Sequence, residues 1–339
     1  MTMSASGDDS RPVAVGIDLG GTGTRVVALD TDGVIRREQT TPTATGPSAV
    51  RAVSDLIETV AGVAADLDLQ GVGIGASGPV DRDGIIRNPS TLRAFSDIPL
   101  ATIIADRLAV PCVIDNDAVT AAIGEHRYGA GRNSDALLVV TLGTGIGVCL
   151  LSRGRPVRAA DGSHPEAGHI SVSGPAAPCY CGLASCWEQV ASRTALNHLA
   201  GGRAEQIAQS ARNGDPAGTD LFGDYGERVG AGLATLLTLY KPDRVVIGGG
   251  AAQYLDLFQA GMRHRLTRSR EYSCAPEFLA AEIGNVAGAV GAAVLSLDTF
   301  RSRPVPPPGA KPGRRTAPCR NRYETFPDLA ANSVRSGRI

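Results

Sequence analysis

Two short segments rich in glycine and threonine constrain the fold of this chain more than any other feature of its sequence. The first is Asp18-Leu-Gly-Gly-Thr-Gly-Thr-Arg25, and the second is Thr141-Leu-Gly-Thr-Gly-Ile-Gly147. Apolar runs typical of β-strands flank both turns: Val13–Asp18, Thr24–Leu29, Ala136–Leu142 and Val148–Leu151. Because the same strand–turn–strand pattern occurs twice, the sequence predicts two similar halves joined by a hinge.

These two turns have the composition of a phosphate-binding site. Glycine lets backbone N–H groups approach phosphate oxygens, and threonine hydroxyls add further donors. The carboxylate of Asp18, at the end of the first strand, can hold a water-bound Mg²⁺ ion. Neither turn matches a Walker A loop, and a lone glycine-rich hairpin is usually only a tight turn. Two such turns facing each other can hold a polyphosphate, and a nucleoside can lie against Gly248-Gly-Gly250 at the end of the apolar run Arg244–Ile247.

This arrangement resembles the superfamily of sugar kinases, actin and the heat-shock ATPases. The resemblance implies an α/β protein with a two-lobed, actin-like ATPase (ribonuclease H-like) fold and a cleft between the lobes. It also implies that the helical segments Asn116–Tyr128 and Ala287–Leu297 connect the two halves.

We accordingly expect an N-terminal lobe at residues 12–116, carrying the first phosphate turn. A C-terminal lobe at residues 117–286 is expected to carry the second turn and the triple glycine. Residues 287–298 are expected to form a helix that packs back toward the N-terminal lobe. The polar residues 1–11 and the tail at 299–339, which is rich in proline and arginine, are predicted to be disordered.

Charge and hydropathy exclude several classes of protein. The chain has 33 basic and 34 acidic residues, so its net charge does not indicate a nucleic-acid-binding protein. No apolar run reaches the roughly 18 residues that a membrane span needs. The N-terminus lacks the basic and apolar regions of a signal peptide. We therefore expect a cytoplasmic protein with neither a nucleic-acid nor a membrane partner.

Three of the seven cysteines crowd into one short segment. Cys179, Cys181 and Cys186, together with His169, offer three thiolates and one imidazole, which suit tetrahedral Zn²⁺. Four protein ligands leave no open coordination position, so the sequence predicts a structural zinc ion that holds an irregular loop. The alternative is a loop of unliganded cysteines.

The same segment makes the resemblance specific. Glu166-Ala-Gly-His169, followed by Cys179-x-Cys-Gly-x-x-Ser-Cys186-x-Glu188, resembles the signature of the ROK family of repressors, open reading frames and kinases. Ser185 stands where the family usually has glycine, and the resemblance covers about residues 12–298. The repressors carry a helix-turn-helix domain ahead of the first glycine turn. About 17 residues precede Asp18 here, too few for such a domain, so we expect a kinase.

The resemblance implies a role for each matching residue. A kinase needs a proton acceptor for the substrate hydroxyl, and Asp117 is the candidate base. From its position alone, Asp117 could equally be a carboxylate that caps a helix N-terminus. The residues expected to bind the hydroxyls of the sugar are Asn116, Glu166, His169 and Glu188.

Mg²⁺ and ATP are the implied cofactors besides Zn²⁺. The residues expected to hold the nucleotide lie in the two turns and the triple glycine. They are Asp18, Gly20, Gly21, Thr22, Thr24, Thr141, Gly143, Thr144, Gly145, Gly248, Gly249 and Gly250. Transfer is expected from the γ-phosphate of ATP to a primary hydroxyl.

The resemblance leaves the identity of the substrate open. Glucose is the first expectation, from the frequency of glucokinases in the family. The form His164-Pro165-Glu166 favours fructokinase-like members, so fructose or mannose follows, and a seven-carbon cyclitol of the valiolone type is a further alternative. Ser77-Gly78-Pro79 and Asn88-Pro-Ser-Thr-Leu92 depart from the family pattern, which puts a substrate contact there in doubt.

An alternative of another class is a non-catalytic sugar sensor that acts through a protein partner. A pure sensor needs neither Asp117 nor two phosphate turns, so their presence favours the kinase. Family members often form dimers, and a homodimer is accordingly expected.

Overall fold

A five-stranded mixed sheet forms the first half of the fold. The computed structural model describes residues 11–46, 48–173, 178–267 and 276–301. The strand order of the first sheet is β3-β2-β1-β4-β5. Strands β1, β2 and β3 pair antiparallel, whereas β4 pairs parallel with both β1 and β5. The strands are β1 (Pro12–Leu19), β2 (Gly23–Asp30), β3 (Ile35–Pro42), β4 (Asp68–Ala76) and β5 (Cys112–Asn116).

The second sheet repeats this topology. Its order is β10-β9-β6-β7-β8, with β6, β7 and β8 antiparallel and β9 parallel to both β6 and β10. The strands are β6 (Ala136–Leu142), β7 (Ile146–Ser152), β8 (Arg155–Pro156), β9 (Arg244–Gly248) and β10 (Glu277–Ala280). The prediction of two similar halves, each built on a strand–turn–strand unit, is therefore confirmed.

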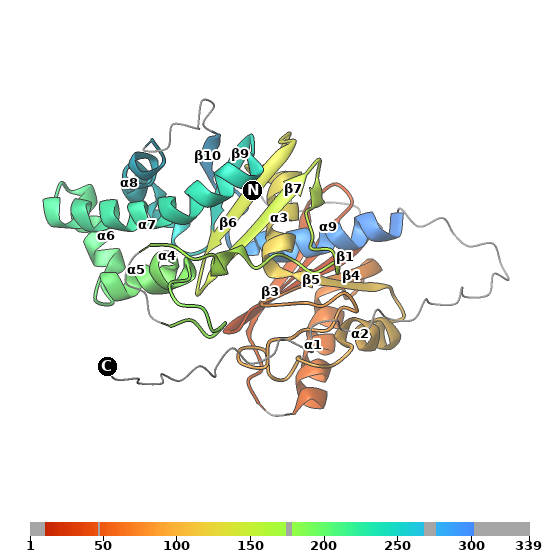
Figure 1. Cartoon of the computed structure of the whole chain (residues 1–339). Helices are drawn as coiled ribbons and strands as arrows, with labels where there is room; N and C mark the ends of the chain where they lie inside the picture. The colour runs from red at the N-terminus through yellow and green to blue at the C-terminus, as the bar shows by residue number, and fades with distance from the viewer. Residues whose placement is uncertain (1–10, 47, 174–177, 268–275, 302–339) are drawn as a thin grey trace, which may run out of the picture. The chain divides into compact units, whose positions relative to one another are not determined.

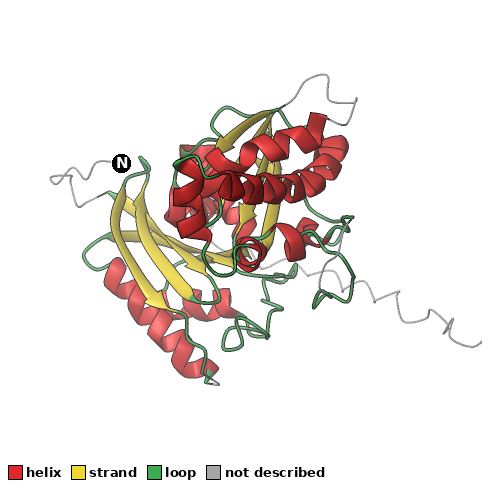
Figure 2. Cartoon of the chain, turned by 90° about the vertical axis from the view of Figure 1, so that its left-hand side faces the viewer, coloured by secondary structure: helices red, strands yellow, loops and turns green. Residues whose placement is uncertain are grey.

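Each sheet has its own helices on one face (Figure 2). Helices α1 (Ala49–Val63) and α2 (Leu100–Leu108) cover the first sheet. Apolar residues at helical spacing on α1 point inward, and the side chain of Ser48 caps its first turn by accepting a hydrogen bond from the N–H of Arg51. The inward residues of both helices join the sheet residues in one hydrophobic core.

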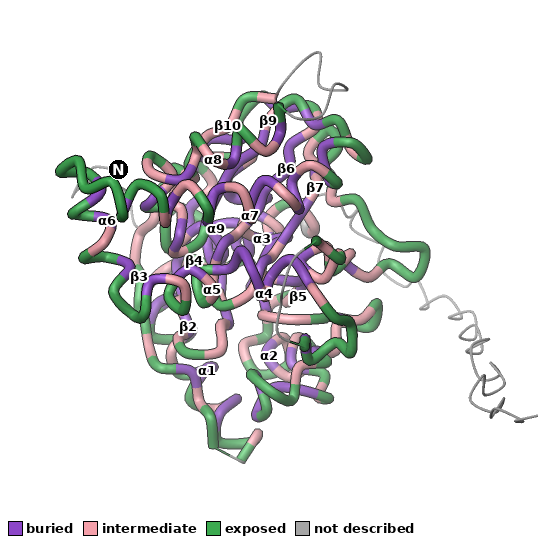
Figure 3. Tube along the Cα trace, turned by 60° about the vertical axis from the view of Figure 1, so that its left-hand side comes forward, coloured by how far each residue is buried: buried purple, intermediate pink, exposed green. Residues whose placement is uncertain are grey.

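The second sheet is covered by a larger group of helices. They are α4 (Glu188–Ala191), α5 (Arg193–Leu199), α6 (Ala204–Arg212), α7 (Pro216–Tyr240) and α8 (Leu255–Thr267). Their core contains the largest buried side chains of this half, Trp187, Phe222, Tyr225 and Phe258. Figure 3 shows α6 at the left edge of the molecule with much of its length exposed, whereas the buried segments lie toward the centre.

Two helices lie between the sheets, α3 (Asp117–Tyr128) and α9 (Ala287–Arg301) (Figure 1). They contact each other extensively; α9 lies on β1 and β4, and α3 lies on β6 and β7. Glycine permits the close approach, because a Cβ on Gly16 of β1 or on Gly73 of β4 would collide with the backbone of α9. Three short 3₁₀ helices, at Ala167–His169, Ala252–Tyr254 and Gly284–Val286, complete the fold.

The buried carboxylate of Glu125 ties the end of α3 to the chain that precedes α9. It accepts hydrogen bonds from the N–H groups of Ala130, Glu282 and Ile283 at 2.9, 3.2 and 2.9 Å. Glu125 thereby links the end of α3 to the segment that leads into α9. The candidate site lies near the first residues of both helices, where Asp117 begins α3 and Gly288 of α9 lies against Asp18.

The expected elements agree with most of the observed ones. The junction expected between residues 116 and 117 coincides with the end of β5 and the start of α3, and the helix expected at 287–298 continues to Arg301. Of the termini expected to be disordered, residues 1–10 and 302–339 lie outside the described residues. No helix in the described part of the chain is long and apolar enough to span a bilayer.

Candidate active site

Asp117 is the first residue of α3, directly after β5. The N-cap residue of this helix is Asn116, but the N–H of Ala118 donates to Oδ1 of both Asn116 and Asp117, each at 2.8 Å, so the Asp117 carboxylate also accepts from the first turn. The Asp117 side chain is half-buried and accepts a hydrogen bond from the hydroxyl of Ser77. Loss of hydration, together with the nearby carboxylates of Asp18 and Glu166, raises the pKa of Asp117 to about 7.

Asp18 lies across from Asp117, at the end of β1. Loss of hydration raises the pKa of Asp18 to about 6, although the guanidinium of Arg25 opposes that shift from a distance of 3.8 Å. Helix α9 begins against this carboxylate, since a Cβ on Gly288 would lie 2.8 Å from its Cγ. Two carboxylates with raised pKa values therefore share one region, an arrangement typical of sites that hold a proton or a cation.

The side chain of Asn116, expected to bind substrate, makes two hydrogen bonds within the protein. Besides capping α3, it donates from Nδ2 to the carbonyl of Gly78 at 3.0 Å. Asn88 donates to the carbonyl of Ser77 at 2.9 Å, so the two segments that differ from the family pattern are hydrogen-bonded to each other. Asn116 thus fixes the start of α3 and the loop after β4.

The other three residues expected to bind substrate gather beyond β7. Glu188 lies with its Oε1 3.6 Å from Nδ1 of His169, and its Oε2 lies beside Gly145 of the second turn. Nε2 of His169 forms a 3.0 Å hydrogen bond with the hydroxyl of Tyr180. Glu166 retains exposed surface, but loss of hydration and the charge of Glu188 raise its pKa. The structure therefore brings the expected sugar-binding groups together.

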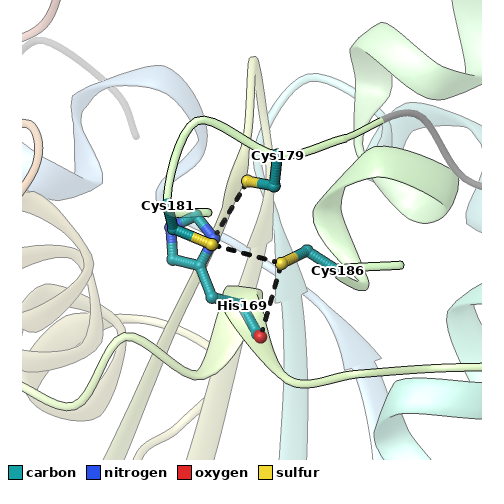
Figure 4. A group of neighbouring side chains, drawn as sticks. All are labelled: His169, Cys179, Cys181 and Cys186. Atoms are coloured by element: carbon teal, nitrogen blue, oxygen red, sulfur yellow. Dashed lines mark hydrogen bonds between the residues drawn. The ribbon is translucent and has the colours of Figure 1, made fainter. Parts of the chain in front are cut away.

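The predicted zinc ligands converge on one point (Figure 4). One ligand atom each from His169, Cys179, Cys181 and Cys186 lies within 4.8 Å of the others. Sγ of Cys179 lies 3.4 Å from Nδ1 of His169, and the sulfurs of Cys181 and Cys186 are 3.4 Å apart. Tetrahedral Zn²⁺ with bonds of about 2.3 Å to sulfur requires ligand atoms about 3.8 Å apart, so these residues fit the ion.

Some of the residues expected to bind the nucleotide already use their polar groups in hydrogen bonds within the protein. The N–H groups of Gly20 and Gly143 donate to the carbonyls of Gly23 and Gly145 at 3.2 and 3.0 Å. The buried hydroxyl of Thr24 lies 2.9 Å from that of Thr43.

Thr141 is also occupied, because its hydroxyl donates to the carbonyl of Gly147 at 3.3 Å. Thr22 and Thr144, by contrast, are exposed at the tips of the two turns. Glycines 20, 21, 143 and 145 shape the turns, and the exposed tips present the free donors.

The triple glycine at Gly248–Gly250 lies directly beside the second turn. Gly249 adopts a φ of +77°, and a Cβ there would lie 2.6 Å from the backbone nitrogen of Leu142. Only glycine fits this position. The side chain of Arg193 lies over Gly250, a contact that the spacing of the sequence does not reveal.

Sequence analysis did not assign roles to Ser77, Tyr180 or Arg193. Each contacts a predicted site residue through tertiary structure: Ser77 bonds Asp117, Tyr180 bonds His169, and Arg193 contacts Gly250. Two of these residues could have been noticed in the sequence. Tyr180 stands between two predicted metal ligands, and Ser77 lies in a segment that departs from the family pattern.

Comparisons with known proteins identify relatives that match most of the chain. The profile of the ROK family matches residues 14–299. A glucokinase from Streptomyces coelicolor is 31% identical over 310 residues, which cover 84% of this chain and 97% of that protein.

Two solved structures share the fold along nearly their whole length. A ROK family glucokinase from Streptomyces griseus, crystallised with glucose and AMPPNP, superimposes with a TM-score of 0.72 at 32% identity, over 84% of this chain and 99% of that one. A ROK hexokinase from Thermus thermophilus gives a TM-score of 0.73 at 28% identity, over 85% and 99%. The fold is therefore the actin-like ATPase fold of sugar kinases, and the chain belongs to the ROK family.

Proposed function

We propose that this protein is an ATP-dependent glucokinase that transfers the γ-phosphoryl group of ATP to the primary hydroxyl of glucose. The relatives that support this are a glucokinase at 31% identity and a glucokinase solved with glucose and AMPPNP. The observation in the molecule that carries the proposal is the carboxylate of Asp117, which lies at the junction of the two halves with a pKa of about 7.

Asp117 is the proposed general base. A sugar hydroxyl is a poor nucleophile until its proton leaves, and a base with a pKa near the working pH is best suited to accept that proton. Ser77 orients the carboxylate through its hydroxyl, and Asn116 fixes the first turn of α3 from which it projects. The proton of the attacking hydroxyl moves to Asp117 as the oxygen approaches phosphorus in line.

The two glycine turns are the proposed nucleotide site. Asp18 would hold Mg²⁺ through water, and the ion would neutralise charge on the transferred phosphoryl group. Exposed donors at Thr22 and Thr144, with the neighbouring glycine amides, would face the phosphates from the two halves. Gly248 and Gly249 would leave bare backbone for the adenosine, whereas the side chain of Arg193 lies over Gly250.

Glu166, His169 and Glu188 are the proposed ligands of the sugar hydroxyls, with Asn116 supporting them. His169 would bind Zn²⁺ through Nδ1, which lies 3.4 Å from Sγ of Cys179. A sugar hydroxyl would then replace the hydroxyl of Tyr180, which lies 3.0 Å from Nε2, as the partner of that nitrogen. Cys179, Cys181 and Cys186 would complete the tetrahedron. The ion would supply a structural anchor that fixes the orientation of His169.

Further parts of the proposal concern the setting of the protein. We place it in the cytoplasm, as a homodimer, without a nucleic-acid partner. The lobes proposed are residues 12–116 and 117–286, with the helix from residue 287 packed back on the first sheet.

The test is ADP release with Mg-ATP, measured for glucose, fructose, mannose, N-acetylated hexosamines and a valiolone-type cyclitol. Asp117→Asn serves as the blank, and its zinc content and circular dichroism are checked against the native protein. The proposal predicts the highest kcat/KM for glucose and turnover at least about 100-fold lower in Asp117→Asn. Preference for another acceptor refutes the glucose assignment, and a folded, zinc-loaded protein that turns over no acceptor refutes the kinase.

A further inference from the structure

Arg193 begins helix α5 immediately beside the second glycine turn. Its backbone N–H donates to the carbonyl of Gly143 at 2.9 Å, and Ser192 caps the helix by accepting the N–H of Ala195 at 3.1 Å. The backbone that carries the Arg193 side chain is therefore attached to the turn at one end and to a helix at the other.

The side chain of Arg193 extends from that turn across the triple glycine. A Cβ placed on Gly250 would lie 2.7 Å from both Cδ and Nη1 of Arg193. Since Gly250 has no side chain, the arginine stem occupies that space and its guanidinium lies where the two glycine segments of the second half come together. Any other residue at 250 would have to displace the side chain of Arg193.

This guanidinium has no acidic partner within the described residues. Two other arginines of the same half are paired: Arg212 lies 2.9 Å from Asp256, and Arg244 lies 2.9 Å from Glu277. Arg193 is exposed, and no carboxylate among the described residues lies within 4.0 Å of it. An unpaired cation beside a predicted polyphosphate site is a candidate ligand for phosphate.

The charge of the surrounding site strengthens this assignment. The carboxylates of Asp18, Asp117, Glu166 and Glu188 all lie in the same region, which disfavours an anionic ligand unless cations offset them. The chain has only two lysines, Lys241 and Lys311, and neither belongs to a glycine turn. Besides the proposed Mg²⁺ ion, a cationic side chain that contacts phosphate beside these turns would therefore be an arginine.

We propose that Arg193 binds the phosphate chain of the nucleotide, from the side of the triple glycine. The inference rests on the proposed kinase function, which places a nucleotide between the glycine turns. A guanidinium offers paired donors to phosphate oxygens, and its exposure lets it contact phosphates that enter between the two glycine segments. Arg193 is thus a nucleotide-binding residue and takes no part in proton transfer.

The experiment compares the native protein with Arg193→Gln and Arg193→Lys by isothermal titration calorimetry. Arg203→Gln is the matched control, because Arg203 is also exposed, begins the next helix and has no carboxylate within 4.0 Å among the described residues. The proposal predicts that Arg193→Gln weakens ADP binding by about 10- to 100-fold. Affinity for adenosine and for glucose should change by less than about 2-fold, and Arg193→Lys should retain part of the ADP affinity.

Three outcomes would overturn the proposal. Equal losses of ADP and adenosine affinity would place the guanidinium on the nucleoside instead of the phosphates. An unchanged affinity for ADP in Arg193→Gln, or a loss of the same size in Arg203→Gln, would refute a specific contact. Binding of ADP by the native protein is measured without any acceptor present. If the native protein does not bind ADP, the proposed kinase function fails. If the native protein binds ADP and Arg193→Gln binds it equally well, only the inference about Arg193 is rejected.

Discussion

The two halves of the molecule share one topology but differ in chemistry. The antiparallel turn of the first sheet follows Asp18 and Leu19, whereas the turn of the second follows Thr141 and Leu142. A carboxylate thus stands in one half where a hydroxyl stands in the other. The first half contributes Asp18 and leads into Asp117, and the second contributes glycine backbone and Arg193. A repeated fold therefore fixes where groups meet, while single side chains decide what each half can do.

The largest expected effect on activity follows when Asp18 is replaced by threonine, the residue at the equivalent position 141 of the second half. Asp18→Thr removes the proposed Mg²⁺ ligand and should lower kcat by about 10²- to 10⁴-fold, corresponding to several kcal/mol of transition-state stabilisation. The measurement is steady-state ADP release at saturating Mg-ATP and glucose, with thermal unfolding as the check on folding.

The matched control for this exchange is Thr141→Asp, which places the carboxylate in the other turn. In the double variant Asp18→Thr/Thr141→Asp, activity should remain as low as in Asp18→Thr alone. Recovery of activity in the double variant would show that the two halves are interchangeable at this position, against the division of roles described here.

The sheets also differ where the central helices cover them. Gly16 pairs with Gly73 in the first sheet, and Val139 pairs with Val246 in the second. Helix α9 approaches the glycine pair closely enough to exclude a Cβ, whereas α3 packs against the valine pair through Val119 and Ala122. The same topological position is therefore filled by a helix backbone in one half and by side chains in the other.

Gly16→Val should lower the free energy of unfolding by about 3 kcal/mol or more, because the helix backbone must move to admit the side chain. Val139→Ala leaves a small cavity and should cost about 2 kcal/mol. Urea-induced unfolding, followed by circular dichroism, measures both. If Gly16→Val costs less than Val139→Ala, then α9 does not pack as tightly on the first sheet as the structure indicates.

Much of the fold could be predicted because its elements carry strong local patterns. The sequence predicts a helix at Leu100–Leu108, a helix at Asp117–Tyr128 and a strand at Ala136–Leu142, and all three have these bounds in the structure. Apolar residues at helical spacing also predict a first long helix at Ser48–Leu67. Helix α1 ends earlier, at Val63, because Asp66 adopts a φ of +63° and turns the chain. Periodicity alone does not register such a turn.

Helix α8 and strand β10 had no counterpart in the sequence analysis. The inward face of α8 consists of Phe258, Met262 and Leu266, one residue for each turn of helix, which is a weaker signal than a full apolar face. Strand β10 has four residues at the edge of its sheet, and its ends are exposed. Both elements are specified by packing against the rest of their half.

For the candidate site, the sequence indicates which residue types are present but not which atoms meet. The metal cluster and the turns were predicted because their members are close in sequence. The contacts of Ser77 with Asp117 and of Arg193 with Gly250 join segments that are distant in sequence. Only the relative placement of strands and helices brings those pairs together.

The carboxylate of Asp117, at the junction of the two halves, should also make stability depend on pH. The pKa of Asp117 rises from 3.8 to about 7 on folding, so the protonated form favours the folded state. This contribution is fully present below about pH 4 and is lost as the pH rises through 7. Asp117→Asn should therefore be more stable than the native protein by up to about 4 kcal/mol at pH 8 and similar to it below pH 4.

Urea unfolding of both proteins across pH 4 to 8 measures this difference, and Thr141→Asn provides a control in the second half. A difference that does not grow with pH would show that Asp117 is ionised as easily in the folded protein as in the unfolded chain. The activity profile should move in the opposite sense, with kcat/KM falling below about pH 7 as Asp117 gains its proton.

The smallest expected effect concerns the ion pair that joins the two halves. The guanidinium of Arg158, in the segment after β8, donates to both carboxylate oxygens of Asp115 on β5, at 3.2 Å to Oδ1. Asp115 in turn accepts the N–H of Asn116 at 2.8 Å. The pair thus links the start of α3 to the segment that continues to Glu166, and we expect Arg158 to position both sets of proposed sugar-binding residues.

Arg158→Met should lower the free energy of unfolding by about 1 kcal/mol, because Asp115 keeps its bond to the backbone of Asn116. The KM for glucose should rise several-fold while the KM for ATP stays within about 2-fold, because Asp115 directly precedes Asn116 and Arg158 lies in the segment that leads to Glu166, two residues proposed to bind the sugar. A double-mutant cycle with Asp115→Asn separates the pair from its surroundings. Equal increases in both KM values, or additive effects in the cycle, would mean that the halves are joined by helices α3 and α9 alone and that the ion pair does not position the sugar site.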